Sequence, residues 1–303
     1  MVPTGQNRQR KRGDKNMSEG VLKAWPERIE GFVFDLDGTI YRGNTPIPGA
    51  IEALHLVRDA GIPSVFLTNN STRSREYFAV KLTGMGFEAN ASDIITTAFA
   101  APRLIRESHA PGSSVLVVGA DSLETSILEA GFKLTECDPD IVVVGLDRSF
   151  TYQKLRTAVR AILAGAAFYA TNPDTLIPDG PELDPGAGTI VAAIASATAH
   201  VTGPIFVGKP EILMPNMALA LLGSKPENTV AVGDQILTDI SAGKRVGMFS
   251  VLVESGVPAA NHPAIFPDRI IRSLLEIPIP QRFVIHPARI AATPFENELE
   301  APC

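Results

Sequence analysis

Short apolar segments alternate with helical patterns along most of this 303-residue chain, and no other feature constrains its fold as strongly. Each apolar segment is followed by a turn and then by apolar residues spaced as on one face of a helix. This alternation is typical of helices packed around a mostly parallel sheet. The sequence therefore predicts an α/β fold.

The expected strands and helices fall into two series, one nested in the other. The strands of the first series are expected at residues 31–34, 65–67, 229–232 and 249–253. The strands of the second series, which begins near Ile95, are expected at residues 115–118, 141–144 and 168–170. A helix over residues 267–276 is expected to end the first series. Because the second series interrupts the first, we expect it to form a sheet of its own.

Composition and charge exclude a nucleic-acid-binding body. Hydrophobic residues make up 45% of the chain and charged residues 20%, as in ordinary globular proteins. Residues 1–20 hold five basic and two acidic residues, which leaves 22 bases and 31 acids, a formal charge of −9, on the remainder. Such an acidic body binds nucleic acid poorly. Residues 1–28 are expected to be a disordered basic tail, with an RNA-binding arm as the alternative.

Neither membrane insertion nor secretion is expected. Residues 185–208 carry no charge, but Gly188 and Gly203 bracket only 14 residues. A helix of that length spans about 21 Å, against about 30 Å for the hydrocarbon core of a bilayer. No apolar stretch of signal-peptide length follows the basic residues, and Cys137 and Cys303 are too few for a disulfide framework. We therefore expect a cytoplasmic protein in which this stretch forms a packed, Ala-rich helix.

The sharpest local feature is the run Asp35-Leu36-Asp37-Gly38-Thr39, directly after the first expected strand. Open α/β sheets bind ligands at the carboxyl ends of their strands. In an extended chain residues i and i+2 point the same way. Asp35 and Asp37 are therefore candidates for one site, although a plain turn is the alternative explanation for Asp37 and Gly38.

A second acidic group follows the strand expected at 229–232. Gly233-Asp234 repeats the arrangement of strand and acid, and Asp239 comes five residues after Asp234. Carboxylates gathered at strand ends repel one another unless a cation lies between them, and Mg²⁺ prefers oxygen ligands. Mg²⁺ is therefore the expected cofactor. For Asp239, capping or orienting the short helix that follows is favoured over direct ligation.

Three further residues carry groups suited to phosphate. Lys209 lies in a turn before a helix, where it is either a solvated side chain or a point charge for a phosphoryl group. Thr68 and Asn69 follow the strand expected at 65–67 and offer a hydroxyl and a main-chain amide. Thr-Asn-Asn is also a good turn and helix start, so this motif alone is weak.

Taken together, these groups resemble the ordered motifs of the haloacid dehalogenase-like phosphohydrolases, and most closely those of the NagD-like, 4-nitrophenylphosphatase-type branch (class IIA). The motifs that carry the resemblance are Asp-Leu-Asp-Gly-Thr-Ile-Tyr-Arg-Gly at 35–43, Thr-Asn-Asn-Ser-Thr at 68–72, Ala-Thr-Asn-Pro-Asp at 170–174, Gly-Lys-Pro at 208–210 and the segment 233–240. The resemblance covers about residues 29–277. It implies a Rossmann-like, doubly wound parallel sheet core with an inserted α/β cap domain.

The resemblance also implies the domain boundaries. The core comprises residues 29–90 and 205–277, and the cap comprises residues 91–204. Residues 278–303 contain repeated prolines and no sustained pattern, and they are expected to be a flexible tail.

The same resemblance implies a mechanism. Asp35 is the nucleophile that becomes an aspartyl-phosphate, and Asp37 protonates the leaving alcohol and then activates water. The implied ligands of Mg²⁺ are Asp35, the main-chain carbonyl of Asp37, and Asp234. The groups implied to bind the phosphoryl oxygens are Thr68, the Asn69 main chain and Lys209.

The cap is expected to select the substrate, because the core offers only a general phosphate site. The candidates in cap turns are Asp147, Arg148, Asn172 and Asp174. Turns also favour Asp and Asn for backbone reasons, which is the alternative explanation for these residues.

We therefore expect a Mg²⁺-dependent phosphomonoester hydrolase that acts on a small phosphorylated metabolite. One alternative is a phosphotransferase that passes the phosphoryl group to a sugar hydroxyl. Another is a receiver-like module that accepts phosphate at Asp35 without turnover. The expected partner is a small-molecule phosphate ester, with no nucleic acid and no membrane, and members of this branch often form homodimers through the cap.

Overall fold

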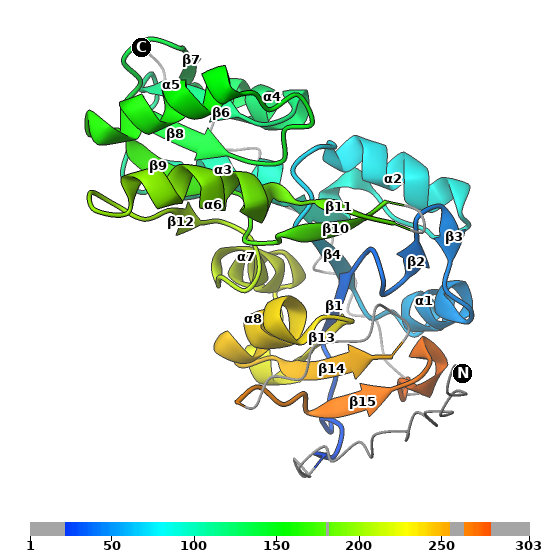
Figure 1. Cartoon of the computed structure of the whole chain (residues 1–303). Helices are drawn as coiled ribbons and strands as arrows, with labels where there is room; N and C mark the ends of the chain where they lie inside the picture. The colour runs from blue at the N-terminus through cyan, green and yellow to red at the C-terminus, as the bar shows by residue number, and fades with distance from the viewer. Residues whose placement is uncertain (1–21, 180–181, 255–263, 280–303) are drawn as a thin grey trace, which may run out of the picture.

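The computed structural model describes residues 22–179, 182–254 and 264–279, and it contains two separate parallel sheets. Figure 1 shows the strands of the first sheet below, in blue to cyan and in yellow to orange, and those of the second above, mainly in green. Helices lie against both sheets. The predicted α/β class is confirmed, while most of the two predicted tails lies outside the described residues.

The first sheet has six strands, each parallel to its neighbours. Their spatial order is β15 (Arg269–Ile271), β14 (Phe249–Val253), β13 (Thr229–Gly233), β1 (Gly31–Asp35), β4 (Ser64–Thr68) and β5 (Ile94–Thr96). The chain leaves β1 on the β4 side and later returns to its other side at β13. The carboxyl ends of β1 and β13 therefore flank the point where the strand order reverses, which is where open α/β sheets bind ligands.

Helices from several parts of the chain run beside the first sheet. Their bounds are α1 (Ala50–Asp59), α2 (Arg75–Gly84), α3 (Thr97–Arg106), α7 (Leu213–Leu222) and α8 (Ser241–Arg245), with a π-helical turn, η3 (Ile236–Ile240), before α8. The Ser74 side chain accepts a hydrogen bond from the Tyr77 amide and so caps α2.

The second sheet has five strands, also parallel. Their order is β12 (Ile205–Phe206), β9 (Ala167–Ala170), β8 (Ile141–Val144), β6 (Ser114–Val118) and β7 (Lys133–Leu134). The helices of this unit are α4 (Asp121–Glu129), α5 (Tyr152–Leu163) and α6 (Ala187–Thr198). Two small hairpins complete the fold: β2 (Tyr41–Arg42) with β3 (Thr45–Pro46), and β10 (Leu176–Asp179) with β11 (Glu182–Pro185).

The Ala-rich stretch forms α6, as predicted. Its Ile190, Val191 and Ile194 are buried in the same apolar cluster as residues of β8 and α5. No helix within the described part of the chain is both long and apolar enough to cross a bilayer.

Strand pairing differs from the prediction at the start of the second series. Ile95 lies in β5, which pairs with β4 and so extends the first sheet rather than opening the second. Ile205 lies in β12, which pairs with β9 and so closes the second sheet. Apolar spacing shows that a strand is present but not which sheet it joins. The division into core and cap at residues 91 and 204 therefore stays a prediction.

The helix predicted over residues 267–276 is wrong. Its apolar pairs Ile270-Ile271 and Leu274-Leu275 have helical spacing, but Ile270 and Ile271 pair with β14 in strand β15. Only the last three residues, η4 (Leu274–Glu276), form a 3₁₀ turn, begun by a Ser273 capping box. An available sheet edge and β-branched side chains outweighed helical periodicity here.

Asp268, just before β15, holds three parts of the first unit together. It is 4% exposed, and its Oδ2 accepts hydrogen bonds from the Ser250 amide (2.9 Å) and hydroxyl (2.8 Å). Its Oδ1 pairs with Lys23 (2.7 Å) and Lys244 (3.0 Å). Burial alone raises the pKa of Asp268, but the hydrogen bonds from Lys23, Ser250 and Lys244 outweigh it and lower this pKa from 3.8 to about 2.

Replacing Asp268 should therefore destabilise the fold in a pH-dependent way. A folded-state pKa below the unfolded value gives stability that is present above pH 3.8 and is lost as the pH falls toward 2. We expect Asp268→Asn to lower the free energy of unfolding at pH 7 by about 2 to 3 kcal/mol. Urea titrations at several pH values measure this. The gap to the wild type should close between pH 4 and pH 2, whereas Asp59→Asn, at an exposed ion pair, should show a small difference at any pH. A gap that persists unchanged at the lowest pH would contradict the assignment.

Candidate active site

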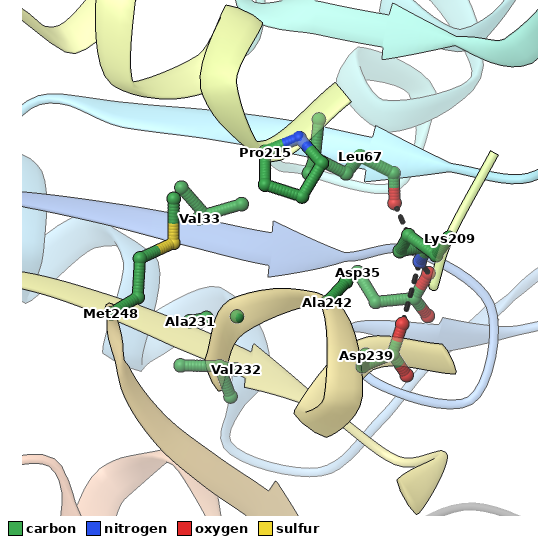
Figure 2. A pocket seen from close by; sticks show the side chains of 11 residues that line it. Val33, Asp35, Leu67, Lys209, Pro215, Ala231, Val232, Asp239, Ala242 and Met248 are labelled. Atoms are coloured by element: carbon green, nitrogen blue, oxygen red, sulfur yellow. Dashed lines mark hydrogen bonds and ion pairs between the residues drawn. The ribbon is translucent and has the colours of Figure 1, made fainter. Parts of the chain in front are cut away.

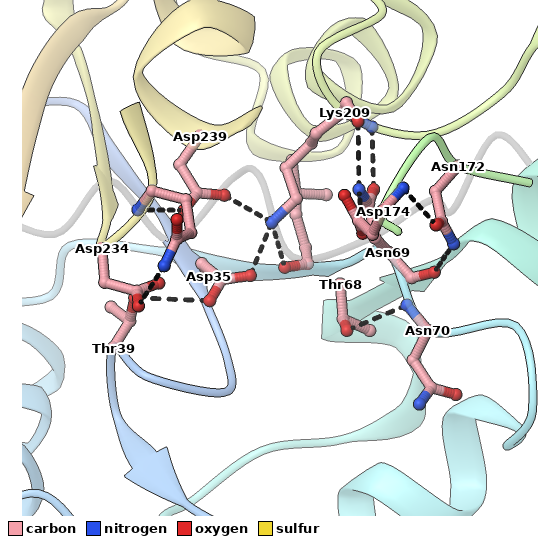
Figure 3. A network of polar contacts seen from close by, with 12 residues as sticks. Asp35, Thr39, Thr68, Asn69, Asn70, Asn172, Asp174, Lys209, Asp234 and Asp239 are labelled. Atoms are coloured by element: carbon pink, nitrogen blue, oxygen red, sulfur yellow. Dashed lines mark hydrogen bonds and ion pairs between the residues drawn. The ribbon is translucent and has the colours of Figure 1, made fainter. Parts of the chain in front are cut away.

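Polar side chains from four segments meet at the carboxyl edge of the first sheet, beside the reversal of strand order. Asp35 ends β1, Thr68 ends β4, and Asp234 follows β13. Lys209 enters from the segment that leaves β12. Figure 3 shows these side chains converging. The structure thus brings together site residues that are up to 199 positions apart in the sequence.

Lys209 lies between two carboxylates. Its Nζ donates to Asp35 Oδ1 at 2.5 Å and to Asp239 Oδ1 at 2.6 Å, with the Leu67 carbonyl at 3.3 Å as a third acceptor. The Lys209 side chain is 5% exposed. Burial lowers the pKa of Lys209, but Asp239 and Asp35 outweigh it and raise that pKa above its ordinary value. Lys209 is therefore a fixed positive charge rather than a solvated side chain.

Apolar residues keep this charged group away from water on its inner side. A cavity of about 20 Å³ lies behind Asp35 and Lys209, with Val33 and Met248 on its wall (Figure 2). Burial raises the pKa of Asp35 well above its ordinary value, although Lys209 partly offsets this effect. The Thr39 hydroxyl donates to the other oxygen, Asp35 Oδ2, at 3.3 Å.

The donor set at this edge suits a divalent cation. One carboxylate oxygen from each of Asp35, Asp234 and Asp239 lies within 4.8 Å of the other two. Burial and the neighbouring Asp239 raise the pKa of Asp234 to about 7. Three acids face one lysine, so negative charge is in excess, and oxygen ligands are those that Mg²⁺ prefers.

The two oxygens of Asp239 already have partners. Oδ1 accepts from Lys209, and Oδ2 accepts from the Gln235 amide at 3.0 Å, at the start of η3. These contacts favour the orienting role that was preferred for Asp239. In the described part of the chain, the partner of Asp234 is the Gln235 side chain, at 3.1 Å.

Gly38 allows the loop after β1 to approach Asp234. Its φ is +92°, a region that other residues rarely adopt, and a Cβ built there would lie 2.4 Å from Asp234 Oδ2. The Gly38 amide donates to the Tyr41 carbonyl at 2.8 Å, which folds the loop back on itself. Asp37 and Gly38 therefore form a turn that is itself part of the site, so the two explanations given for these residues are not alternatives.

Asp37 stands apart from the three clustered carboxylates. Its side chain is exposed, two residues beyond the strand end that carries Asp35. Partial burial raises the pKa of Asp37, while the charge of Lys81, hydrogen bonds from the Gly43 and Gly38 main chain and the charge of Arg42 act in the opposite direction. Lys81 itself lies over the Tyr41 ring at 4.0 Å. An acid with a raised pKa at the open side of a site is suited to exchanging protons with a bound ligand.

Thr68 and Asn69 follow the sheet edge at β4. The Thr68 hydroxyl oxygen accepts from the Asn70 amide at 3.2 Å. The Asn69 side chain also has partners, although the sequence indicated a role for its main-chain amide alone. Its Oδ1 accepts from the Lys209 amide at 2.8 Å, and its Nδ2 donates to the Lys209 carbonyl and to Asp174, both at 3.0 Å.

The four cap candidates divide into two pairs. Asn172 and Asp174 reach the site, since the Asn172 side chain donates to the Asn69 carbonyl at 2.7 Å and Asp174 accepts from Asn69. Asp147 binds Lys154 at 2.6 Å, and Arg148 binds Asp184 of β11 at 2.7 Å. These contacts lie within the second unit.

Sequence reasoning missed the side-chain roles of Thr39 and Asn69. A hydroxyl four residues after Asp35 was a usable signal for Thr39. For Asn69 there was none, because its partners lie 105 and 140 residues away.

Known proteins resemble this chain over most of its length. A family model described as haloacid dehalogenase-like hydrolase matches residues 32–133, and a second, HAD-hydrolase-like model matches residues 206–277. The 5′-nucleotidase YutF of Bacillus subtilis is 37% identical over 233 residues, which are 77% of this chain and 90% of that protein.

Solved structures agree with this similarity. NagD from E. coli K-12 superposes with a TM-score of 0.75 at 34% identity, covering 83% of this chain and 99% of that chain. The glycerol phosphate phosphatase Rv1692 from Mycobacterium tuberculosis, solved in complex with magnesium, has a TM-score of 0.75 at 33% identity, covering 82% of this chain and 76% of that chain. The resemblance inferred from the motifs is thereby confirmed.

Proposed function

This chain belongs to the haloacid dehalogenase-like hydrolases, and on that premise we propose that it is a Mg²⁺-dependent phosphomonoester hydrolase that acts on small phosphorylated metabolites in the cytoplasm. One observation carries the proposal. Asp35 presents a carboxylate at the edge of the sheet, with one oxygen held by Lys209 and with two more acids beside it. Similar proteins are named an acid sugar phosphatase and a glycerol phosphate phosphatase.

In the proposed reaction, an Asp35 oxygen attacks phosphorus and the ester oxygen leaves. A covalent aspartyl-phosphate replaces one difficult displacement by two easier ones. Asp37 gives its proton to the departing alcohol and then takes a proton from the water that hydrolyses the intermediate. Its position at the open side of the site and its raised pKa suit both roles.

Charge is the main obstacle, because a phosphate dianion must approach a carboxylate. Lys209 lies within 2.5 Å of the attacking group, and its fixed charge offsets part of the repulsion. Mg²⁺, when held by Asp35, Asp234 and the Asp37 main-chain carbonyl, supplies the positive charge that balances the rest. Thr68 and the Asn69 main chain are proposed to complete the binding of the phosphoryl oxygens.

We also propose that the unit built on the second sheet is a cap that selects the leaving group, with residues 29–90 and 205–277 as the core. The relatives differ in substrate, one being named a 5′-nucleotidase and another a glycerol phosphate phosphatase. Such variety fits a common phosphate site under a variable cap. The proposal includes Asp147 and Arg148 as residues that face the leaving group when the cap closes.

The proposal is tested by phosphate release. The purified protein with Mg²⁺ should hydrolyse 4-nitrophenyl phosphate over many turnovers, and a panel of sugar phosphates, nucleotides, glycerol phosphate, phosphoglycolate and pyridoxal phosphate should identify the preferred ester. A single turnover per protein would instead indicate a phospho-accepting module. A new ester formed at the cost of inorganic phosphate, when sugar acceptors are added, would indicate a phosphotransferase.

Gly38→Ala should reduce turnover without unfolding the protein. The added Cβ meets the Asp234 carboxylate at 2.4 Å, so the loop that carries Asp37 must shift. Displacements of about 1 Å in an active site cost about 100-fold in rate, and we expect a loss of kcat of that order. Gly43→Ala is the matched control, because Gly43 also has a positive φ, +58°, but nothing lies within 4 Å of its built Cβ. Equal losses in the two variants would show that backbone strain alone is responsible.

A further inference from the structure

Asp174 belongs to the second unit, yet its carboxylate points at the machinery of the first. It lies in the segment between β9 and β10, four residues beyond the end of β9. The Asp174 carbonyl accepts from the Gly188 amide at 2.9 Å, and its own amide donates to Asn172 Oδ1 at 3.1 Å. Both main-chain polar groups are therefore tied down, and the carboxylate is presented from a fixed position.

The partner of that carboxylate is the Asn69 carboxamide. Asn69 Nδ2 donates to Asp174 Oδ2 at 3.0 Å and also to the Lys209 carbonyl at 3.0 Å, while Asn69 Oδ1 accepts from the Lys209 amide at 2.8 Å. A carboxylate and a carbonyl only accept, and a main-chain amide only donates. These three partners allow one orientation of the Asn69 carboxamide. Lys209 holds it on one side, and Asp174 prevents it from rotating on the other.

The main chain of Lys209 is thereby clamped on both of its polar groups. The Asn69 side chain packs tightly against this main chain, since a Cβ built on Gly208 would lie 2.5 Å from Asn69 Oδ1. The Asn69 carbonyl is fixed as well, by Thr97 Oγ1 at 2.9 Å and by the Asn172 side chain at 2.7 Å. Any rotation of the Asn69 side chain must therefore move the Lys209 main chain, and with it an ammonium that lies 2.5 Å from Asp35.

From this chain of contacts we propose that Asp174 is a positioning residue for the phosphatase reaction. Its carboxylate fixes the Asn69 carboxamide, which holds the Lys209 main chain and so the ammonium at Asp35. This inference rests on the proposed function. It gives Asp174 a role that is independent of the leaving group, and it makes the phosphate site sensitive to the placement of the segment that follows β9.

The role predicts how kinetic losses depend on the substrate. Asp174→Ala should lower kcat/KM by about one to two orders of magnitude, by a similar factor for 4-nitrophenyl phosphate and for a phosphate ester with a polar leaving group. Asp174→Asn keeps an oxygen that can accept from Asn69, and it should retain at least about a third of the wild-type value. A loss confined to the polar ester would instead show that Asp174 contacts the leaving group, and would overturn the proposal.

A double-mutant cycle tests the route through Asn69. If Asp174 acts only by holding that carboxamide, then Asn69→Ala and Asn69→Ala/Asp174→Ala should have equal kcat/KM, because the second change removes nothing further. Multiplied losses would overturn the proposal. Asp140→Ala is the matched control. Like Asp174, Asp140 accepts hydrogen bonds through its carboxylate from a distant segment, here from the Ser114 amide and hydroxyl, but it lies at the opposite end of the strands of the second sheet. This variant should lower stability but not kcat/KM.

The outcomes separate this proposal from the function on which it rests. A wild type without phosphatase activity defeats the proposed function, whereas an active wild type with an equally active Asp174→Ala defeats only the positioning role. Thermal unfolding of every variant comes first. Should Asp174→Ala fail to fold, the comparison passes to Asp174→Asn, for which a loss of more than about 10-fold in folded protein would overturn the proposal.

Discussion

Asp35→Asn is expected to remove phosphatase activity by at least about three orders of magnitude while the protein stays folded. An amide oxygen is a poor nucleophile, and no other carboxylate can take over the attack from the same place. Asp234 and Asp239 lie close by, but each is engaged by Gln235, and Asp239 also binds Lys209. Release of 4-nitrophenolate from purified protein measures the effect.

The fold of Asp35→Asn should survive because its contacts are polar and partly replaceable. An amide retains an oxygen that can accept from Lys209 and a nitrogen that can face Thr39. The variant also removes a buried carboxyl group whose ionisation burial disfavours. Thermal unfolding should show a shift of a few degrees at most. Asp59→Asn, at an exposed position of α1, is the control for kinetics and should leave them unchanged.

Trapping distinguishes the proposed nucleophile from other routes. Wild-type protein quenched during turnover should yield a peptide containing Asp35 whose mass is raised by one phosphoryl group, and Asp35→Asn should not. An adduct on another residue, or retained activity with contamination excluded, would falsify the assignment. Direct attack by water on phosphorus would leave no adduct at all.

Sequence patterns predicted the elements that carry the site because the signals there are local. The strand at 31–34, the acids that follow it, and the strand at 229–232 with Asp234 are each visible within a few residues. The carboxyl ends of parallel strands share an edge, so the meeting of Asp35 and Asp234 follows from the fold class. The helix predicted at 267–276 failed for the opposite reason, since a neighbouring strand, β14, decided its conformation.

Long-range partners could not be predicted from the sequence. Asn69 was taken as a main-chain phosphate ligand, and nothing in its neighbourhood indicated that its side chain joins Lys209 to Asp174. The second series was expected to begin near Ile95, but Ile95 joins the first sheet, because apolar spacing carries no information about pairing. The similarity to known family members covers most of the chain and not only the motifs. It leaves the roles of individual side chains to be measured.

Chelation of Mg²⁺ is expected to abolish activity and to leave the secondary structure intact. Without the cation, Asp35, Asp234 and Asp239 hold an excess of negative charge against one lysine, and an incoming phosphate is repelled. The fold itself depends on other contacts. The strands of both sheets are joined by their own main-chain hydrogen bonds, and Lys209 bridges Asp35 and Asp239, so these contacts do not require a cation. Loss of the circular dichroism signal on adding EDTA would show that the fold, and not only the activity, depends on the cation.

The ligand set predicts how the metal requirement shifts. Among the described residues, one side chain donates to Asp234 whereas two groups donate to Asp239, so Asp234 has more capacity left for a cation. Asp234→Asn should therefore raise the Mg²⁺ concentration for half-maximal activity by at least about 10-fold. Glu211→Gln, at an exposed ion pair with Arg245, is the matched control and should not change it. Titrating activity against free Mg²⁺ in the three proteins measures the difference.

Ca²⁺ should occupy the same carboxylates and inhibit. It binds oxygen at about 2.3 to 2.6 Å with six to eight ligands, whereas Mg²⁺ binds at about 2.0 to 2.1 Å with near-octahedral geometry. Asp35 has one oxygen fixed by Lys209, so a larger ion must displace either the other oxygen or the bound phosphate. Because in-line attack tolerates little misplacement, we expect turnover with Ca²⁺ to fall below about 1% of that with Mg²⁺. Adding Ca²⁺ to the Mg²⁺-loaded protein should inhibit competitively with the metal. Equal turnover with both ions would show that the placement of Asp35 does not depend on the cation, and the charge argument would then have to rest on Lys209 alone.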